Sequence, residues 1–122
     1  MNRKAIAKKF LQFASSGKVR EAYEKFIHPE FFHHNPFFPG DRNSFLVGME
    51  KSAVEFPNKQ FEVLRTLEDG NLVAVHGRIK LSPEMQWIAL IHIFRIEGNL
   101  IIEEWEAGQE IPKNSANQNG AF

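Results

Sequence analysis

The sequence contains no cysteine among its 122 residues, which excludes disulfides and thiolate chemistry. An excess of one charge is also lacking, because 15 Lys and Arg balance 15 Asp and Glu. Without net charge there is no overall field to attract nucleic acid or an anionic membrane. No apolar run reaches membrane-spanning length, and the first residues, MNRKAIAKKF, lack the apolar core of a secretory signal. These absences indicate a cytoplasmic protein that binds neither nucleic acid nor membranes.

Phenylalanine, in contrast, is abundant, with 12 copies against a single tyrosine. This composition suits a large apolar core or an apolar pocket. A chain of 14.1 kDa is expected to form one domain with one core. We assign that domain to residues 1–111. The polar segment 112–122, rich in Asn and Gly, is expected to be a loosely ordered tail.

The N-terminal third has the period of amphipathic helices. One helix is expected over Asn2–Ala14 and a second over Val19–Ile27. A third opens at Asp41–Ser44, where several residues can cap it, and ends before Pro57. Its buried side is expected to include Val54.

Beyond the third helix the apolar period changes to two, which predicts consecutive β-strands. The expected strands are Lys59–Glu68, Leu72–Leu81, Trp87–Ile96 and Leu100–Gln109. In the first of them, Phe61, Val63 and Leu67 are expected to share one face. Helices followed by strands indicate an α+β domain, in which the helices cover one face of a strongly curved antiparallel sheet. The other face is also apolar, which predicts a homodimer through the sheet.

The last two strands form a hairpin that carries the candidate catalytic groups. His92 interrupts its apolar first arm, and Glu104 and Glu106 lie on the second. A two-residue loop at Gly98-Asn99 would put His92 and Glu106 on opposite faces. A three-residue loop, with its asparagine in the left-handed conformation, would set His92 opposite Glu104 and make Glu106 a diagonal neighbour on the same face. The sequence permits either register.

The segment Phe31–Gly40, FFHHNPFFPG, contains two prolines, which excludes a simple helix or a central strand. Of the adjacent His33 and His34, one is expected to face the interior and one the solvent. The segment is either a loop from surface to core or a pocket wall made of Phe37, Phe38 and one imidazole. Adjacent histidines are a poor metal pair, so no metal site is expected.

Four motifs carry a resemblance to a known family. They are FHHNPFFPGDRNSF, DGNLVAVHGR, IHIFRIEGNLIIEEWE and IPKNSANQNGAF, in this order over about residues 5–122. The sequence resembles the SnoaL-like polyketide cyclases of the NTF2-like superfamily. The resemblance implies an NTF2-like α+β cone, with N-terminal helices packed on a strongly curved antiparallel sheet, a deep apolar pocket and a homodimer.

The resemblance also implies catalytic roles. In the characterised cyclases, a pocket carboxylate after the final-strand tryptophan acts as a base, and a histidine on the preceding strand assists. These positions fall on Glu106, which follows Trp105, and on His92. The family residue is usually Asp, so the longer Glu moves the carboxylate on the order of an ångström, a displacement that matters for catalysis.

The sequence thus predicts acid–base catalysis on an apolar or aromatic small molecule, without a metal or organic cofactor. Glu106 would be the base, with a pKa raised toward neutrality by the apolar pocket, and His92 its partner. Ring closure, isomerisation or hydrolysis could follow. The expected substrate contacts are His34, Asn35, Phe37, Phe38, His76, Trp87 and Glu104. Three alternatives remain. Glu106 pairs with Arg78 or Arg95, His92 is a core histidine hydrogen-bonded to Glu104, or the chain is a non-catalytic module that holds an apolar ligand or a protein partner.

Overall fold

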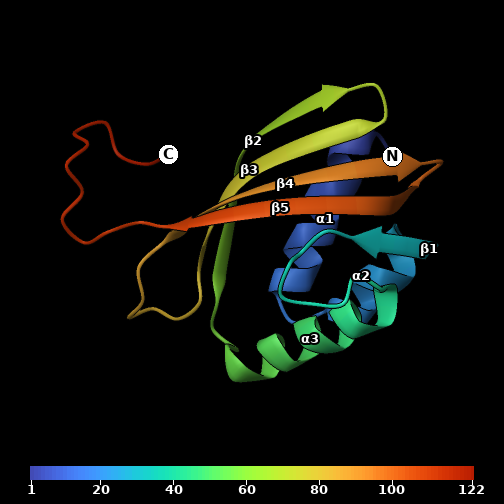
Figure 1. Ribbon diagram of the computed structural model, residues 1–122, viewed down its shortest axis with the longest axis horizontal. Coiled ribbons are helices and arrows are strands. Elements are labelled where there is room, and N and C mark those ends of the chain that lie inside the picture. The colour runs from blue at the N-terminus through green and yellow to red at the C-terminus, as the bar shows by residue number, and fades with distance from the viewer.

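Three helices pack against one five-stranded sheet in the computed structural model, which describes residues 1–122 (Figure 1). The elements are α1 (Arg3–Ser15), α2 (Val19–Phe26), β1 (Ile27–His33), α3 (Arg42–Glu55), β2 (Gln60–Asp69), β3 (Leu72–Lys80), β4 (Ile88–Glu97) and β5 (Leu100–Glu110). The segment after β5 contains neither helix nor strand and extends away from the sheet (Figure 1). The predicted α+β architecture is confirmed, and the helices and the last four strands lie within about two residues of their expected ends.

The sheet has the strand order β1-β5-β4-β3-β2. Strands β2 to β5 form the predicted antiparallel meander, and β1 adds one parallel pairing with β5. The sequence did not predict β1. Its Pro29 is tolerated because β1 is an edge strand, where a residue without an N–H group need not interrupt the ladder.

Two of the helices begin at side-chain caps. The side chain of Asn2 accepts a hydrogen bond from the N–H of Ala5 at 2.8 Å, and this bond starts α1. Asp41 accepts one from the N–H of Ser44 at 2.9 Å and starts α3, as the cluster of capping residues predicted. The second cap also anchors the connection between β1 and α3. None of the helices has the length and apolar character needed to cross a lipid bilayer.

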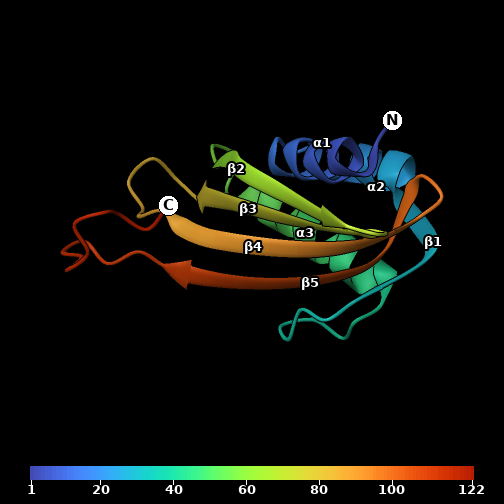
Figure 2. The same cartoon turned by 90° about the horizontal axis from the view of Figure 1, so that it is seen from above.

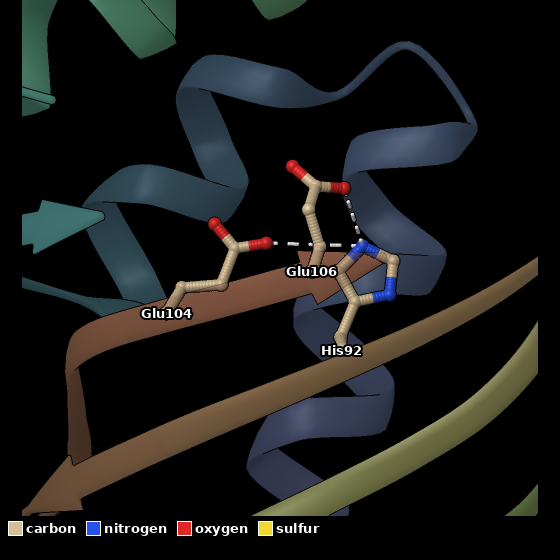
Figure 3. Close-up of side chains that lie close together, drawn as sticks. All are labelled: His92, Glu104 and Glu106. Carbon is tan, nitrogen blue, oxygen red and sulfur yellow. Dashed lines mark ion pairs between the residues drawn. The ribbon is translucent and has the colours of Figure 1, made fainter. Parts of the chain in front are cut away.

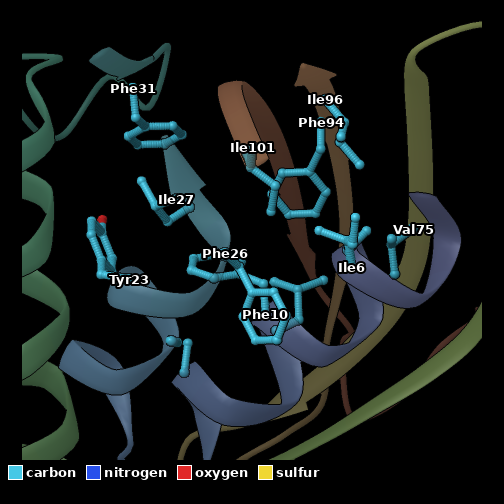
Figure 4. Packing of buried hydrophobic residues seen from close by; sticks show 14 of the residues in the cluster. Ile6, Phe10, Tyr23, Phe26, Ile27, Phe31, Val75, Phe94, Ile96 and Ile101 are labelled. Atoms are coloured by element: carbon cyan, nitrogen blue, oxygen red, sulfur yellow. The ribbon is translucent and has the colours of Figure 1, made fainter. Parts of the chain in front are cut away.

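The apolar core lies between α1, α2 and the inner face of the sheet (Figures 2 and 4). Phe10 of α1 is at its centre, with edge-on contacts to Tyr23 and Phe94 at centroid distances of 6.0 and 5.9 Å. Aromatic side chains of this size bury large apolar areas, which stabilises the helix–sheet contact. Phe10 also reaches the wall of a cavity beside the core.

The outer face of the sheet carries exposed apolar side chains. Ile91 and Ile93 project from β4 and are 48% and 37% exposed. Their partners on β5 are Ala107 and Trp105. We call these four residues the outer-face patch. The helices pack on the other face of the sheet, so no helix covers the patch, and the side chain of His34 stacks on its Trp105 (Figure 2).

Candidate active site

A cavity of about 240 Å³ opens between α1, α3 and the inner face of the sheet. Its apolar wall includes Phe10, Phe38, Phe45, Phe61, Ile79 and Leu90. Its main polar groups are Asn35, Ser52, Lys59, His92, Glu104 and Glu106. At ~30 Å³ per water molecule, the volume corresponds to about eight waters, which sets the scale of a ligand at one or two rings. An apolar pocket with a few converging polar groups is the usual form of a small-molecule site.

His92 lies directly opposite Glu106 on the neighbouring strand, so both anticipated registers are wrong. The loop at Gly98-Asn99 does have two residues, and the glycine takes the positive φ of 61°. A bulge then leaves Ile102 of β5 without a partner on β4. This extra residue shifts the ladder by one and returns Glu104 and Glu106 to the face of His92.

The side chains of His92, Glu104 and Glu106 point toward one another from β4 and β5 (Figure 3). Nε2 of His92 is 3.3 Å from Oε2 of Glu106 and 3.8 Å from Oε1 of Glu104. His92 is 6% exposed and Glu104 is 3% exposed. The other carboxylate oxygen of Glu106 accepts a hydrogen bond from the side-chain amide of Asn35. The geometry therefore gives Glu106 two partners and leaves Glu104 with only the longer contact.

The two carboxyl groups differ in charge. Burial, and then the nearby Glu106 carboxylate, raise the pKa of Glu104 well above its usual value. Burial also acts to raise the pKa of Glu106, but His92 and Asn35 outweigh this effect, so its pKa is lowered. The expectation that the pocket raises the pKa of Glu106 is therefore wrong. The two shifts have opposite directions and favour the ionised form of Glu106 and the protonated form of Glu104, a separation that suits one base and one acid.

The same three groups place their donor atoms within 4.8 Å of one another, a spacing that a divalent cation could also use. The sequence did not predict this grouping, because no spacing among its histidines and Glu106 places them together before the strand register is known. A carboxyl group must lose its proton to bind a metal, so Glu104 would have to give up the proton that its burial favours. Acid–base chemistry uses that proton directly.

His33 is a polar residue near the site that the predicted contacts omitted. One of the two adjacent histidines was expected to face inward, and it is His33, which is 5% exposed. Its Nδ1 accepts a hydrogen bond from the N–H of Asn35 at 3.1 Å, so Nε2 carries the proton and is buried without a partner. Burial lowers the pKa of His33 and favours this neutral form. The alternation of Phe31 and His33 inward against Phe32 outward, once β1 is known, identifies the inner histidine.

The family model for the SnoaL-like domain matches residues 7–104. The chain belongs to the SnoaL-like domain family. No curated protein sequence matches the chain. The SnoaL-like match includes His92 and Glu104 and ends two residues before Glu106, so the role of Glu106 depends on the geometry described above.

Solved structures share the SnoaL-like fold at low sequence identity. A candidate polyketide cyclase from Acidithiobacillus ferrooxidans is 20% identical, with 87% of each chain covered and a TM-score of 0.74. IdmH, a candidate polyketide cyclase from Streptomyces antibioticus, is 17% identical, with 88% of this chain and 92% of that chain covered and a TM-score of 0.73. An NTF2-like protein of unknown function from Cytophaga hutchinsonii is 16% identical over 89% of this chain and 91% of that chain, with a TM-score of 0.71. At these identities the likeness concerns the fold.

Two predicted contacts in the β1–α3 connection lie outside the cavity of this SnoaL-like domain. His34 faces outward, stacks on Trp105 at a centroid distance of 5.0 Å and contacts Glu103 at 2.8 Å. Arg95 also pairs with Glu103 and not with Glu106. Phe37 is 88% exposed. Asn35 and Phe38, by contrast, line the cavity.

Two more predicted contacts lie outside the cavity lining at other strands. His76 sits opposite Ile91 of the outer-face patch and contacts the guanidinium of Arg65. Trp87 packs under the guanidinium of Arg78, at 4.2 Å from the ring centroid. Arg78 pairs with Glu62 at 2.8 Å and not with Glu106. The period-two pattern could not place His76, because β3 has both faces partly apolar, and Trp87 lies just before the start of β4.

Proposed function

We propose that the chain is an acid–base enzyme acting on a small, mainly apolar carbonyl compound that binds in the cavity. The observation that carries this proposal is the directly opposed His92 and Glu106 pair beside Glu104 at an apolar wall. The separated pKa directions of the two carboxyl groups support it. Such groups are typical of sites that move protons.

The first step assigned to this site is removal of a proton from a carbon beside the carbonyl group. The ionised Glu106 takes the proton, so the C–H bond breaks, an O–H bond forms on the carboxyl group and the electron pair becomes an enolate. The protonated Glu104 donates a hydrogen bond to the enolate oxygen. His92, whose Nε2 faces both glutamates, holds their orientation, and Glu106 itself returns the proton.

The enolate then has two fates that need no further reagent. It attacks a second carbonyl carbon of the same molecule, which closes a ring and leaves an alkoxide that takes the proton back from Glu106, or it regains that proton at another carbon, which isomerises the substrate. The likeness to candidate polyketide cyclases favours ring closure. Both reactions share the proton abstraction, and this step is the proposed activity.

Proton abstraction can be tested with model ketones. The protein is expected to speed deuterium uptake from D₂O into one- and two-ring ketones such as 1-indanone and 2-tetralone, followed by NMR. Buffer that contains equal concentrations of acetate and imidazole, but no protein, gives the reference rate for the same chemical groups free in solution. If no member of the series exchanges faster with protein than in this buffer, the proposed activity is wrong.

A second candidate function is a non-catalytic module that stores or carries an apolar ligand. The observation that favours it is the lowered pKa of Glu106, because a weaker base removes protons from carbon less readily. The two functions differ in one result. A binding module saturates with the ketone probes, measured by calorimetry, without accelerating their deuterium exchange.

We infer that two copies of the chain associate through the outer-face patch. Replacing Ile93 by glutamate is expected to convert a dimer at micromolar concentration into a monomer in sedimentation experiments, because a charge would be desolvated in the interface. Val54→Glu is the matched control. Val54, which was expected to be buried, is 83% exposed on α3, away from the sheet. A monomeric parent protein under the same conditions contradicts the inference.

A further inference from the structure

A half-buried lysine lines the cavity without an acidic partner. Nζ of Lys59 donates a hydrogen bond to Oγ of Ser52 at 2.9 Å, and both residues belong to the cavity wall. None of the ion pairs within 4.0 Å in the structure involves Lys59. The ammonium group is thus held by one neutral hydroxyl beside an apolar space.

Lys59 and the acid–base cluster lie at different levels of the sheet. Lys59 comes two residues before Phe61, which pairs with Ile79. Ile79 in turn pairs with Ile88, and His92 is four residues further along that strand. At about 3.3 Å per residue, His92 is ~13 Å from the level of Ile88. The apolar side chains of the wall therefore separate a cationic end of the cavity from an acidic end.

The electrostatics of the two ends are complementary to a ligand with one acidic group. Partial burial removes water from the ammonium of Lys59 and lowers its pKa, and no protein carboxylate compensates for this loss. A buried charge is normally paired, so a ligand anion is the group that would restore the missing partner. The ionised Glu106 repels an anion at the other end of the cavity. This repulsion fixes the orientation of the bound ligand, with its acidic group at Lys59.

We propose that the cavity binds a one- or two-ring carboxylate, with its carboxylate on Lys59 and Ser52 and its opposite end at Glu106. In combination with the proposed function, on which this second part rests, the substrate is a keto acid whose reacting carbon lies about one ring system away from its carboxylate. The contact with Lys59 is independent of any catalysis. Lysine binds carboxylates through a compact charge with several donors, and Ser52 adds one hydroxyl donor.

The test compares 2-naphthoate with 2-naphthamide, a neutral molecule of nearly the same shape, by calorimetry. The protein is expected to bind the acid at least about tenfold more tightly, which is the effect of one charge-assisted hydrogen bond. Lys59→Gln removes this preference, and Lys59→Arg retains most of it. Lys51→Gln is the matched control, because it makes the same charge change at an exposed position on α3, one residue from Ser52.

Three results overturn the proposal: equal affinities for the two probes, a preference that survives Lys59→Gln, or no binding of either probe at millimolar concentration. The proposed function fails separately. If Glu106→Gln leaves deuterium exchange unchanged while the preference for naphthoate is present and depends on Lys59, only the catalytic assignment is wrong. If deuterium exchange depends on Glu106 but the protein does not bind 2-naphthoate more tightly than 2-naphthamide, only the carboxylate site is wrong.

Discussion

Replacing Glu106 by glutamine is expected to slow deuterium uptake by a ketone probe about a thousandfold, within the usual range for loss of a general base. Glutamine has nearly the same shape, and its carbonyl oxygen can still accept the hydrogen bond from Asn35. It cannot take a proton from carbon. The affinity for the ketone is expected to stay within a few-fold, because the apolar wall is unchanged.

Glu62→Gln is the control for this experiment. Glu62 pairs with Arg78 on the surface, so the variant makes the same chemical change outside the cavity and is expected to keep the full rate. Glu106→Asp adds a geometric test, since it restores the residue usual in the cyclases and withdraws the carboxylate from His92 by on the order of an ångström. If Glu106→Gln keeps more than about a tenth of the exchange rate, Glu106 is not the base.

The elements of the fold were predictable because their signals are local. The helices and the four consecutive strands follow from periods of 3.6 and two within short windows. Strand β1 was missed because its pairing with β5 joins segments about seventy residues apart, as between His33 and Glu104. No local pattern in the segment around Pro29 reports such a pairing, and proline argues against a strand.

The candidate site was only partly predictable, because two bulges decide which side chains meet. The bulge at Ile102 brings His92 and Glu106 together, and no turn residue indicates it. A register shift between Val63 and Arg65 in β2 likewise moves Leu67 away from the face of Phe61, and Leu67 is 68% exposed where a shared face was expected. An extra residue in a strand leaves the composition unchanged while it exchanges the two faces.

The charge states of the site depend on contacts that no sequence window contains. Glu104 and Glu106 are two residues apart on one strand, so their shared face was predictable once the register was known. Which of them is ionised depends on Asn35, about seventy residues away in the chain, and on the position of His92. The raised pKa therefore belongs to the carboxyl group that the sequence had assigned only to substrate binding.

Replacing Glu104 by glutamine is expected to stabilise the protein at neutral pH and to leave its stability nearly unchanged at pH 4. The pKa of Glu104 is higher in the folded than in the unfolded chain, so the folded state binds the proton more tightly. From the unfolded carboxyl pKa of about 4.3 up to the folded value, the free energy of unfolding therefore falls as pH rises. Glutamine mimics the protonated form at every pH and removes this loss.

The size of this effect follows from the separation of the two pKa values, at about 1.4 kcal/mol per unit, so the Tm difference at neutral pH is expected to reach several degrees. Thermal unfolding followed by circular dichroism from pH 4 to pH 8 measures this difference.

Glu106 also affects the pH dependence of stability. Its pKa is lowered, so its stabilisation is present above the unfolded pKa and is lost as pH falls. This contribution is common to both proteins and largely cancels in the comparison. Glu30→Gln, at an exposed position, controls for the loss of one charge. If the Tm difference between Glu104→Gln and the parent protein stays constant with pH, or shrinks as pH rises, Glu104 is ionised in the cavity. In that case Glu104 is not the acid of the site.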